Sequence, residues 1–377
     1  MLDKSIHFLL ENAGPVIQYR LKKEILNNLF KAEEERLLNQ IYKLPYFKLL
    51  ENYSKLNGYI GNGMHSYDNW RGNVLHENPL QDGEKAARLL SYYSIPKEHL
   101  LVKNFVQAMR NETILQKEFS YIPPEIARFK NRFLGLNNGN CLMSIIYTMQ
   151  AMLGYGDDFD DLVKFQHIAL KGFERILKLS SLDEILKKRT RLEKKYKYPY
   201  IEEKEYFPNV YTLEILAYTK SWRSKKNIQM LTDSFNHINK IMKMEHLNQI
   251  HVKIKNKYYI PCFAFTAPIK TFHSDLIDSI VYRRILTEIA MLGVGDMVDV
   301  IKNSIANIKN AVNSEGILKM NLEQAHNKKY SPKNIKYPSP YVDVRLETDY
   351  TKPHALDCDL TFWAVQLLYM VENIKNE

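Results

Sequence analysis

One six-residue pattern, Met-Leu-Gly-x-Gly-Asp, occurs twice in the chain, at 152–157 and at 291–296. Apolar residues recur with helical spacing before each copy, and a second amphipathic stretch follows each copy. The first glycine of the pattern predicts a left-handed cap at the end of the first helix, and the aspartate is placed to cap the start of the next helix. Each copy therefore predicts two helices joined by a short turn.

Weaker copies of this helical hairpin follow the same order. They span 84–109 and 210–241, and a first helix alone spans 360–374. A unit that recurs about five times in one chain is typical of stacked hairpins that bury a shared core. The sequence predicts an all-α fold in which the hairpins form an α/α toroid, that is, a closed ring of helical hairpins.

Long loops rich in proline and aromatic residues separate the predicted hairpins. They span 116–140, 194–209, 255–274 and 319–357. Each precedes the first helix of a hairpin, so in a repeat array they would gather at one end, and loops of this length are commonly functional. Residues 1–50 have helical apolar spacing and predict an N-terminal cap on a toroid of residues 51–377, together one compact unit.

Composition limits the class of protein. The chain has 377 residues, 45% of them hydrophobic, which is enough for a large core. It has no apolar run of the roughly 18 residues that a membrane span needs, and its N-terminus does not resemble an export signal. The three cysteines are far apart, so we expect a reduced, cytoplasmic protein.

The net charge of +10 raises the question of nucleic-acid binding. The lysines are scattered, except for the run KKRTRLEKKYK at 187–197, and such a run is usually a solvated surface. We therefore do not expect nucleic acid as a partner. The sequence predicts nothing about the oligomeric state.

Four segments resemble bacterial proteins of the prenyltransferase and squalene-cyclase-like family, over essentially the whole chain. They are NAGPVIQYRLKKEI at 12–25, GYIG at 58–61 with His65 and Trp70, LGYGD at 153–157, and DCDLT at 357–361. The resemblance implies two concentric layers of helices around a central cavity. It also implies terpene cyclisation or prenyl transfer on a small hydrophobic, isoprenoid-like substrate.

The segment DCDLT gives the sharpest candidate for catalysis. Class II terpene cyclases carry Asp-x-Asp-Asp-Thr, in which the middle aspartate protonates an alkene. This chain has Asp357, Asp359 and Thr361, but Leu360 stands where the family has the third acid. The resemblance implies Asp359 as the proton donor, although such an acid needs neighbours that tune its charge.

Polar residues also stand where other loops lead into inner helices. Helix capping explains each of them singly, but their recurrence favours a shared site. We predict that Trp70, His273, Asp275 and Asp359 point into one pocket, with His273 and Asp275 as further catalytic candidates. Aromatic side chains can stabilise carbocations. The predicted substrate contacts are Trp70, His65, Tyr211, Tyr259 and Phe263.

Two metal sites were weighed. The run DDFDD at 157–161 fits the Asp-Asp-x-x-Asp pattern that binds Mg²⁺, but the partner motif is missing because position 283 is arginine. Cys358, with His354 or His273, could bind Zn²⁺, but the Asp-x-Cys spacing of the prenyltransferases is absent. The sequence therefore predicts no cofactor, with Mg²⁺ and Zn²⁺ as the alternatives.

Two other functions remain open. Other α/α toroids cut glycans with paired carboxylates, for which Asp275 and Asp359 would serve. A non-catalytic helical-repeat binding protein is the third reading. An aromatic cavity with a lone acid would favour the isoprenoid enzyme, and facing carboxylates in a polar groove would favour the carbohydrate-active one.

Overall fold

The computed structural model is mostly helical. It describes residues 1–63, 82–118, 141–188, 199–202, 205, 207–242, 251–254, 257–259, 269–273, 280–319, 346–349 and 352–373. Helices account for 67% of these residues and strands for 5%. The predicted all-α class is confirmed.

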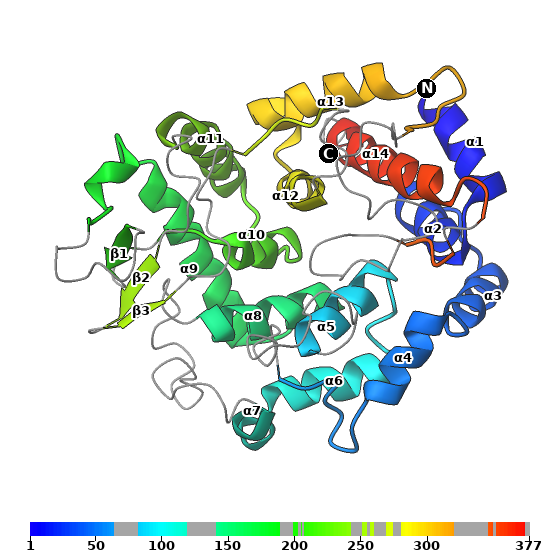
Figure 1. Ribbon diagram of the computed structural model, residues 1–377, viewed down its shortest axis with the longest axis horizontal. Coiled ribbons are helices and arrows are strands. Elements are labelled where there is room, and N and C mark those ends of the chain that lie inside the picture. The colour runs from blue at the N-terminus through cyan, green and yellow to red at the C-terminus, as the bar shows by residue number, and fades with distance from the viewer. Residues whose placement is uncertain are drawn as a thin grey trace. The chain divides into compact units, whose positions relative to one another are not determined.

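The chain divides into two compact units (Figure 1). Unit 1 contains residues 1–108, 271–290 and 300–377, and unit 2 contains residues 109–270 and 291–299. Unit 1 holds α1 (Leu2–Asn12), α2 (Pro15–Arg20), the π-helical turn η1 (Leu21–Ile25), α3 (Lys31–Ile41), α4 (Pro45–Tyr53), α5 (Gly83–Tyr92), and nearly all of α6 (Leu100–Arg110), α12 (Ile280–Met291), α13 (Asp299–Ala311) and α14 (Ala355–Asn373).

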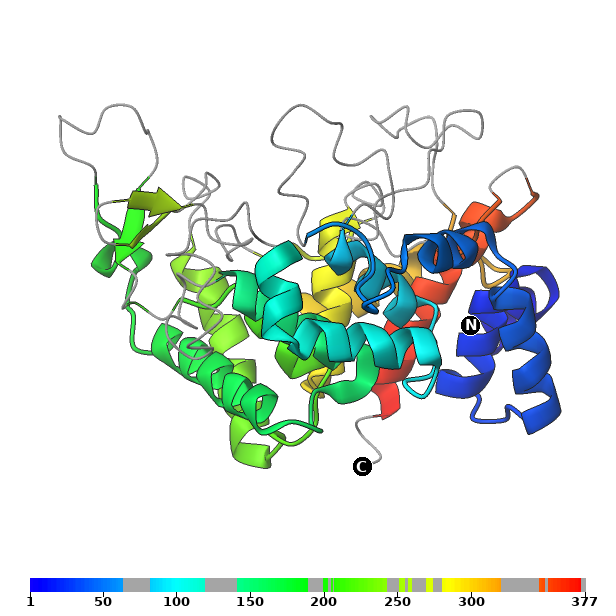
Figure 2. The ribbon, with the colours of Figure 1, turned by 90° about the horizontal axis from the view of Figure 1, so that it is seen from below.

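Unit 2 holds the helices of the middle of the chain. They are α7 (Glu112–Glu118), α8 (Cys141–Gln150) with the π-helical turn η4 (Ala151–Tyr155), α9 (Asp160–Ile176), the 3-10 turn η5 (Leu182–Glu184), α10 (Val210–Ala217), α11 (Lys225–Ile241) and the 3-10 turn η9 (Gly295–Met297). Helix α9 packs on both α10 and α11, and α8 packs on α10 (Figures 1 and 2).

The predicted hairpins are present in their predicted order, as α5–α6, α8–α9, α10–α11 and α12–α13, followed by α14. Their turns also have the predicted backbone. Gly154 and Gly293 have φ values of 86° and 82°, which is the left-handed region that favours glycine. In the α5–α6 hairpin Ser94 takes this conformation with φ 53°, so this weaker copy keeps the geometry without the glycine.

The sequence predicted that Asp157 caps the helix that follows it, but Asp157 binds elsewhere. Its Oδ2 accepts a hydrogen bond from Lys220 N at 2.9 Å, and its Oδ1 accepts from Ser221 N and Gln166 Nε2, each at 3.1 Å. Burial alone would raise the pKa of Asp157, but these bonds hold it below its usual value. Residues 156–159 form a turn between η4 and α9. From this turn the Asp157 carboxylate reaches the turn between α10 and α11, and so it joins the α8–α9 hairpin to the α10–α11 hairpin.

Two predicted loops of unit 2 contain short strands. β1 (Tyr200–Glu202) pairs in parallel with β2 (His251–Ile254), and β2 pairs antiparallel with β3 (Lys257–Tyr259). The register places Tyr200 opposite His251 and Val252 opposite Tyr259. Aromatic and β-branched residues favour strands, which explains pairing in segments that carry no helical periodicity.

Burial separates two kinds of helix. Every residue of α10 is buried, and so is every residue of α5 except Ser91. By contrast, α9, α11 and α13 each bury one face and expose the other. The first helix of a hairpin is thus the inner one, and the second is amphipathic and faces solvent.

The N-terminal helices of unit 1 lie against its C-terminal part. Helices α1 and α2 both pack on α14 (Figures 1 and 2). Lys4 Nζ donates to Ser314 O at 2.9 Å, and Ser5 Oγ donates to Gly316 O at 2.6 Å. Residues 1–50 therefore share one compact unit with the last helix.

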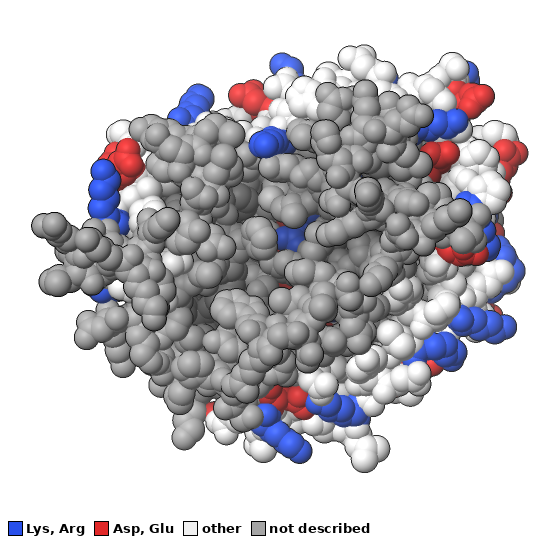
Figure 3. Space-filling model, viewed as in Figure 1, with Lys and Arg blue, Asp and Glu red and all other residues white. Residues whose placement is uncertain are grey.

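Basic side chains are prominent along α3 and α4 on the described part of the face in Figure 3, with acidic side chains beside some of them. Lys22 pairs with Glu33 at 2.5 Å and Lys48 with Glu51 at 2.7 Å. The described residues here present mixed charge rather than one sign. No helix in the described ranges is long and apolar enough to cross a membrane.

Alanine substitutions at two glycines with positive φ should distinguish the cost of backbone strain from the cost of a steric clash. An added Cβ meets nothing within 4 Å at Gly293, but at Gly316 it would lie 2.6 Å from Ser5 N. We expect Gly293→Ala to lower the free energy of unfolding by about 1 kcal/mol, and Gly316→Ala by more than about 2 kcal/mol. Urea unfolding measures both, and equal losses would contradict the close approach of α1 to the 313–317 turn.

Candidate functional site

Four of the nine predicted site residues lie outside what the structure describes. This holds for His65, Trp70, Phe263 and Asp275, and at Tyr259 only the backbone strand is described. The predicted meeting of Trp70 and Asp275 with other site residues therefore stays a prediction.

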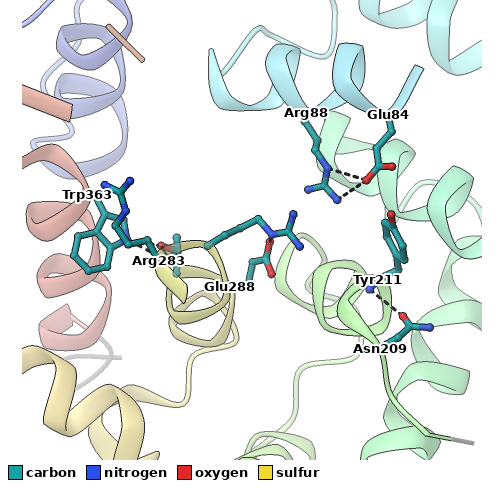
Figure 4. A network of polar contacts seen from close by, with 9 residues as sticks. Glu84, Arg88, Asn209, Tyr211, Arg283, Glu288 and Trp363 are labelled. Atoms are coloured by element: carbon teal, nitrogen blue, oxygen red, sulfur yellow. Dashed lines mark hydrogen bonds and ion pairs between the residues drawn. The ribbon is translucent and has the colours of Figure 1, made fainter. Parts of the chain in front are cut away.

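His273 and Tyr211 have contrasting surroundings. His273 is exposed before α12, and its Nδ1 lies 3.4 Å from Asn307 Nδ2 of α13. Tyr211 is fully buried in the first turn of α10, and its backbone N donates to Asn209 Oδ1 at 2.9 Å (Figure 4). Asn209 is the N-cap of α10, which agrees with capping as the role of polar residues at such positions.

Asp359 lies inside α14 rather than at its start. The helix begins at Ala355, five residues before the predicted Leu360. Asp359 is 5% exposed, and its Oδ1 accepts from the backbone N of Leu346 at 2.6 Å and of Glu347 at 3.3 Å. Its carboxylate thus holds the backbone of the segment that precedes the helix.

The other residues of DCDLT also have local contacts. Thr361 Oγ1 accepts from Leu318 N at 3.0 Å, and Asp357 Oδ2 lies 3.3 Å from His354 Nδ1. Burial, with nearby Glu347 adding to it, raises the pKa of the Cys358 thiol, and so disfavours the thiolate that zinc ligation needs. Among the described residues, no group of three or more His, Cys, Asp or Glu side chains is arranged to hold a metal ion.

The largest concentration of buried charge lies on inner helices of unit 1. On α5, Arg88 is 0% and Glu84 1% exposed. Arg88 Nε and Nη2 both donate to Glu84 Oε1, at 3.0 and 2.9 Å (Figure 4). This is a fully enclosed ion pair between residues one helical turn apart.

A second pair of charges lies in the first turn of α5. Asp82 is its N-cap and accepts from Lys85 N at 2.9 Å, while Lys85 Nζ lies 3.9 Å from Asp82 Oδ2. Burial lowers the pKa of Lys85, although Asp82 and Glu84 act in the opposite direction. Residues 82–88, at the N-cap and in the first turns of α5, therefore include four buried charged residues.

Helix α12 carries the pattern in reverse order. Arg284 Nε lies 3.3 Å from Glu288 Oε1, and the two side chains are 6% and 2% exposed. Beside them, Trp363 of α14 donates from Nε1 to Thr287 Oγ1 at 3.0 Å. In Figure 4 the side chains of Arg88 and Glu288 leave α5 and α12 in converging directions.

Buried ion pairs are poor sources of stability. Desolvation of each ion costs several kcal/mol, and apolar residues of similar volume often serve the fold equally well. What such pairs offer is chemistry: guanidinium groups bind carboxylates and phosphates, and carboxylates accept hydrogen bonds from hydroxyl and ammonium groups. Perturbed, enclosed charges are also typical of functional sites.

From the sequence we predicted Glu84 only as one of the polar residues at inner-helix starts, and we did not identify Arg88, Arg284 or Glu288, although a signal was present. Glu84 and Arg88, and likewise Arg284 and Glu288, are opposite charges at i,i+4 on helices predicted to be the first of a hairpin. Such pairs usually lie on solvated faces. These four side chains are candidates for function because α5 and α12, the first helices of their hairpins, bury them.

Comparisons with known proteins do not indicate which class of protein this chain belongs to. No protein-family model matches the chain, and no curated protein and no solved structure matches it. The geometry of the described residues is thus what supports a proposal on function.

Variants of Glu84 and Arg88 test whether their ion pair is buried in the folded protein. We expect Arg88→Met to lower the free energy of unfolding by about 3–5 kcal/mol, because it removes the cation beside a buried carboxylate. The double variant Glu84→Leu/Arg88→Met should recover most of that loss. Denaturant unfolding of the two single variants and the double variant measures this, and a double-variant loss equal to the sum of the two single losses would show that the charges act independently.

Asp359 and Asp357 should differ in their effect on stability. Asp359→Ala takes the acceptor from two buried backbone N–H groups, so we expect a loss of about 2–4 kcal/mol. Asp357→Ala removes only a partly exposed contact with His354, and we expect less than about 1 kcal/mol. Thermal melting of both variants compares them, and a larger loss for Asp357 would be inconsistent with these contacts.

Proposed function

We propose that this chain is an α/α toroid that binds a small polar ligand among its inner helices. We further propose that Glu84, Arg88, Arg284 and Glu288 contact the ligand. One observation carries the proposal, namely that these four charged side chains are at most 6% exposed, two of them on α5, which is buried nearly all round.

The chemistry of the four groups favours a ligand with several hydrogen-bonding or ionic groups. Ligand sites combine enclosure with a few placed polar side chains, which fix orientation and specificity. Two guanidinium and two carboxylate groups supply both donors and acceptors. A hydrocarbon alone offers no group to which these side chains could hydrogen-bond.

Carbohydrate chemistry is the enzymatic form of this proposal that we favour. It uses two carboxylates, about 5–10 Å apart, as acid and base or as acid and nucleophile. Glu84 and Glu288 are better candidates for that pair than Asp359, because the Asp359 carboxylate holds the backbone of Leu346 and Glu347. Asp275 lies outside the described residues.

An isoprenoid substrate remains a second proposal through its head group. A diphosphate is an anion that arginine binds well, so Arg88 and Arg284 would suit a prenyl diphosphate better than a neutral hydrocarbon. The resemblance of the sequence to squalene-cyclase-like proteins supports an isoprenoid substrate. The aromatic contacts predicted for it, such as Trp70 and Phe263, lie outside the described residues.

A ligand panel tests both readings. Isothermal titration of the purified chain with sugars, sugar phosphates, organic acids, prenyl diphosphates and prenyl alcohols should yield binders among the polar and anionic compounds. For any such compound we expect Glu84→Leu/Arg88→Met to weaken binding by about 100-fold or more, the scale of two lost charged contacts.

The matched control removes an ion pair of the same kind from the surface. Lys48 and Glu51 of α4 are 55% and 42% exposed, and Lys48→Met/Glu51→Leu should leave affinity unchanged. Equal binding of prenyl alcohols and prenyl diphosphates, or full affinity in the Glu84→Leu/Arg88→Met variant, would count against the proposal.

A further inference from the structure

The first 25 residues of the chain are fastened to the C-terminal part of unit 1 at several points. The contacts are Lys4 with Ser314, Ser5 with Gly316, Gly14 with Glu347, Glu24 with Gln366, and Arg20 with the ring of Phe362. Together they join segments more than 300 positions apart in sequence.

One of these contacts is both buried and able to change charge. Glu347 Oε1 accepts from Gly14 N at 2.5 Å, and Gly14 is the N-cap of α2. Glu347 is 7% exposed. The fit is tight, because a Cβ added at Gly14 would lie 2.7 Å from Glu347 Oε2.

Among the described residues, four titratable groups lie around this carboxyl. Asp349 and Lys352 flank it on its own segment, and Cys358 and Asp359 face it from α14. From α2 the contact is the Gly14 amide. Asp359 fixes the backbone of Leu346 and Glu347, so the Glu347 side chain has a rigid base from which to reach α2.

We propose that Glu347 is a proton-controlled latch that fastens α1 and α2 to α14, held closed by the neutral carboxyl and loosened when the carboxyl ionises. The neutral group keeps a carbonyl oxygen that accepts the Gly14 bond. The ionised group must place a full charge where little water reaches it.

The direction of the pH dependence follows from burial. Burial raises the pKa of Glu347, and Asp349 adds to this, while the Gly14 N–H and Lys352 oppose it. A carboxyl whose pKa is raised by folding stabilises the closed state fully below its ordinary pKa. That stabilisation is lost as the pH rises through the raised value.

Hydrogen exchange measured by mass spectrometry tests the latch on the full chain between pH 5 and pH 8.5. After correction for intrinsic exchange, protection of the amides at 14, 16–18 and 346–348 should fall as pH rises, while amides of α9 stay constant. Each unit of pKa shift corresponds to about a tenfold change in the opening equilibrium.

Three variants complete the design. Glu347→Gln keeps the acceptor without the charge, so its protection should stay high at every pH. Gly14→Ala places a methyl group against the carboxyl, so its protection should be low at every pH. The control Glu11→Gln makes the same chemical change at an exposed position of α1 and should behave as the wild type.

Two results would overturn the latch. One is wild-type protection of the N-terminal amides that does not change with pH relative to α9. The other is a Glu347→Gln variant that keeps the wild-type pH dependence. The wild-type series alone decides the question if Glu347→Gln does not fold. None of these outcomes depends on the ligand proposed above.

Discussion

Pairing of opposite charges one helical turn apart is what allows α5 and α12 to keep charged residues inside the core. A lone arginine or glutamate at 0–2% exposure would cost the fold several kcal/mol, whereas Glu84 with Arg88 and Arg284 with Glu288 compensate one another within a single helix. Each helix thus carries part of the compensation for its own buried charges. An enclosed helix can then carry polar chemistry without losing its place in the core.

The hairpin order could be read from the sequence because it depends on local rules. Helical periodicity and a glycine in the left-handed region act within a few residues, and Gly154 and Gly293 take that conformation. The partner of Asp157 could not be found in this way. Its carboxylate binds amides at 220 and 221, more than 60 positions ahead, which no local rule identifies. Packing of hairpin on hairpin decides that contact.

The site shows the same limit. Asp359 was chosen because it resembles a proton donor and stands near a predicted helix start, but α14 begins earlier and Asp359 binds the backbone of the preceding segment. Conversely, the sequence around Glu84 and Arg88 looks like an ordinary solvated helix face. Solvent exposure separates a surface pair from an enclosed one, and exposure is a property of the whole fold. Charged i,i+4 pairs on the first helix of a hairpin are the signal worth seeking in similar repeat proteins.

The contacts of α1 and α2 with the C-terminal part of unit 1 have a consequence for folding during synthesis. Gly14 leaves the ribosome 333 residues before Glu347 does. At synthesis rates of about 5–20 residues per second, the interval is on the order of 17–70 seconds. Throughout it α1 and α2, which bury Leu9, Val16 and Ile17 in the finished protein, lack the α14 surface on which they pack. Until α14 is synthesised, apolar surface of these two helices is therefore exposed to aggregation.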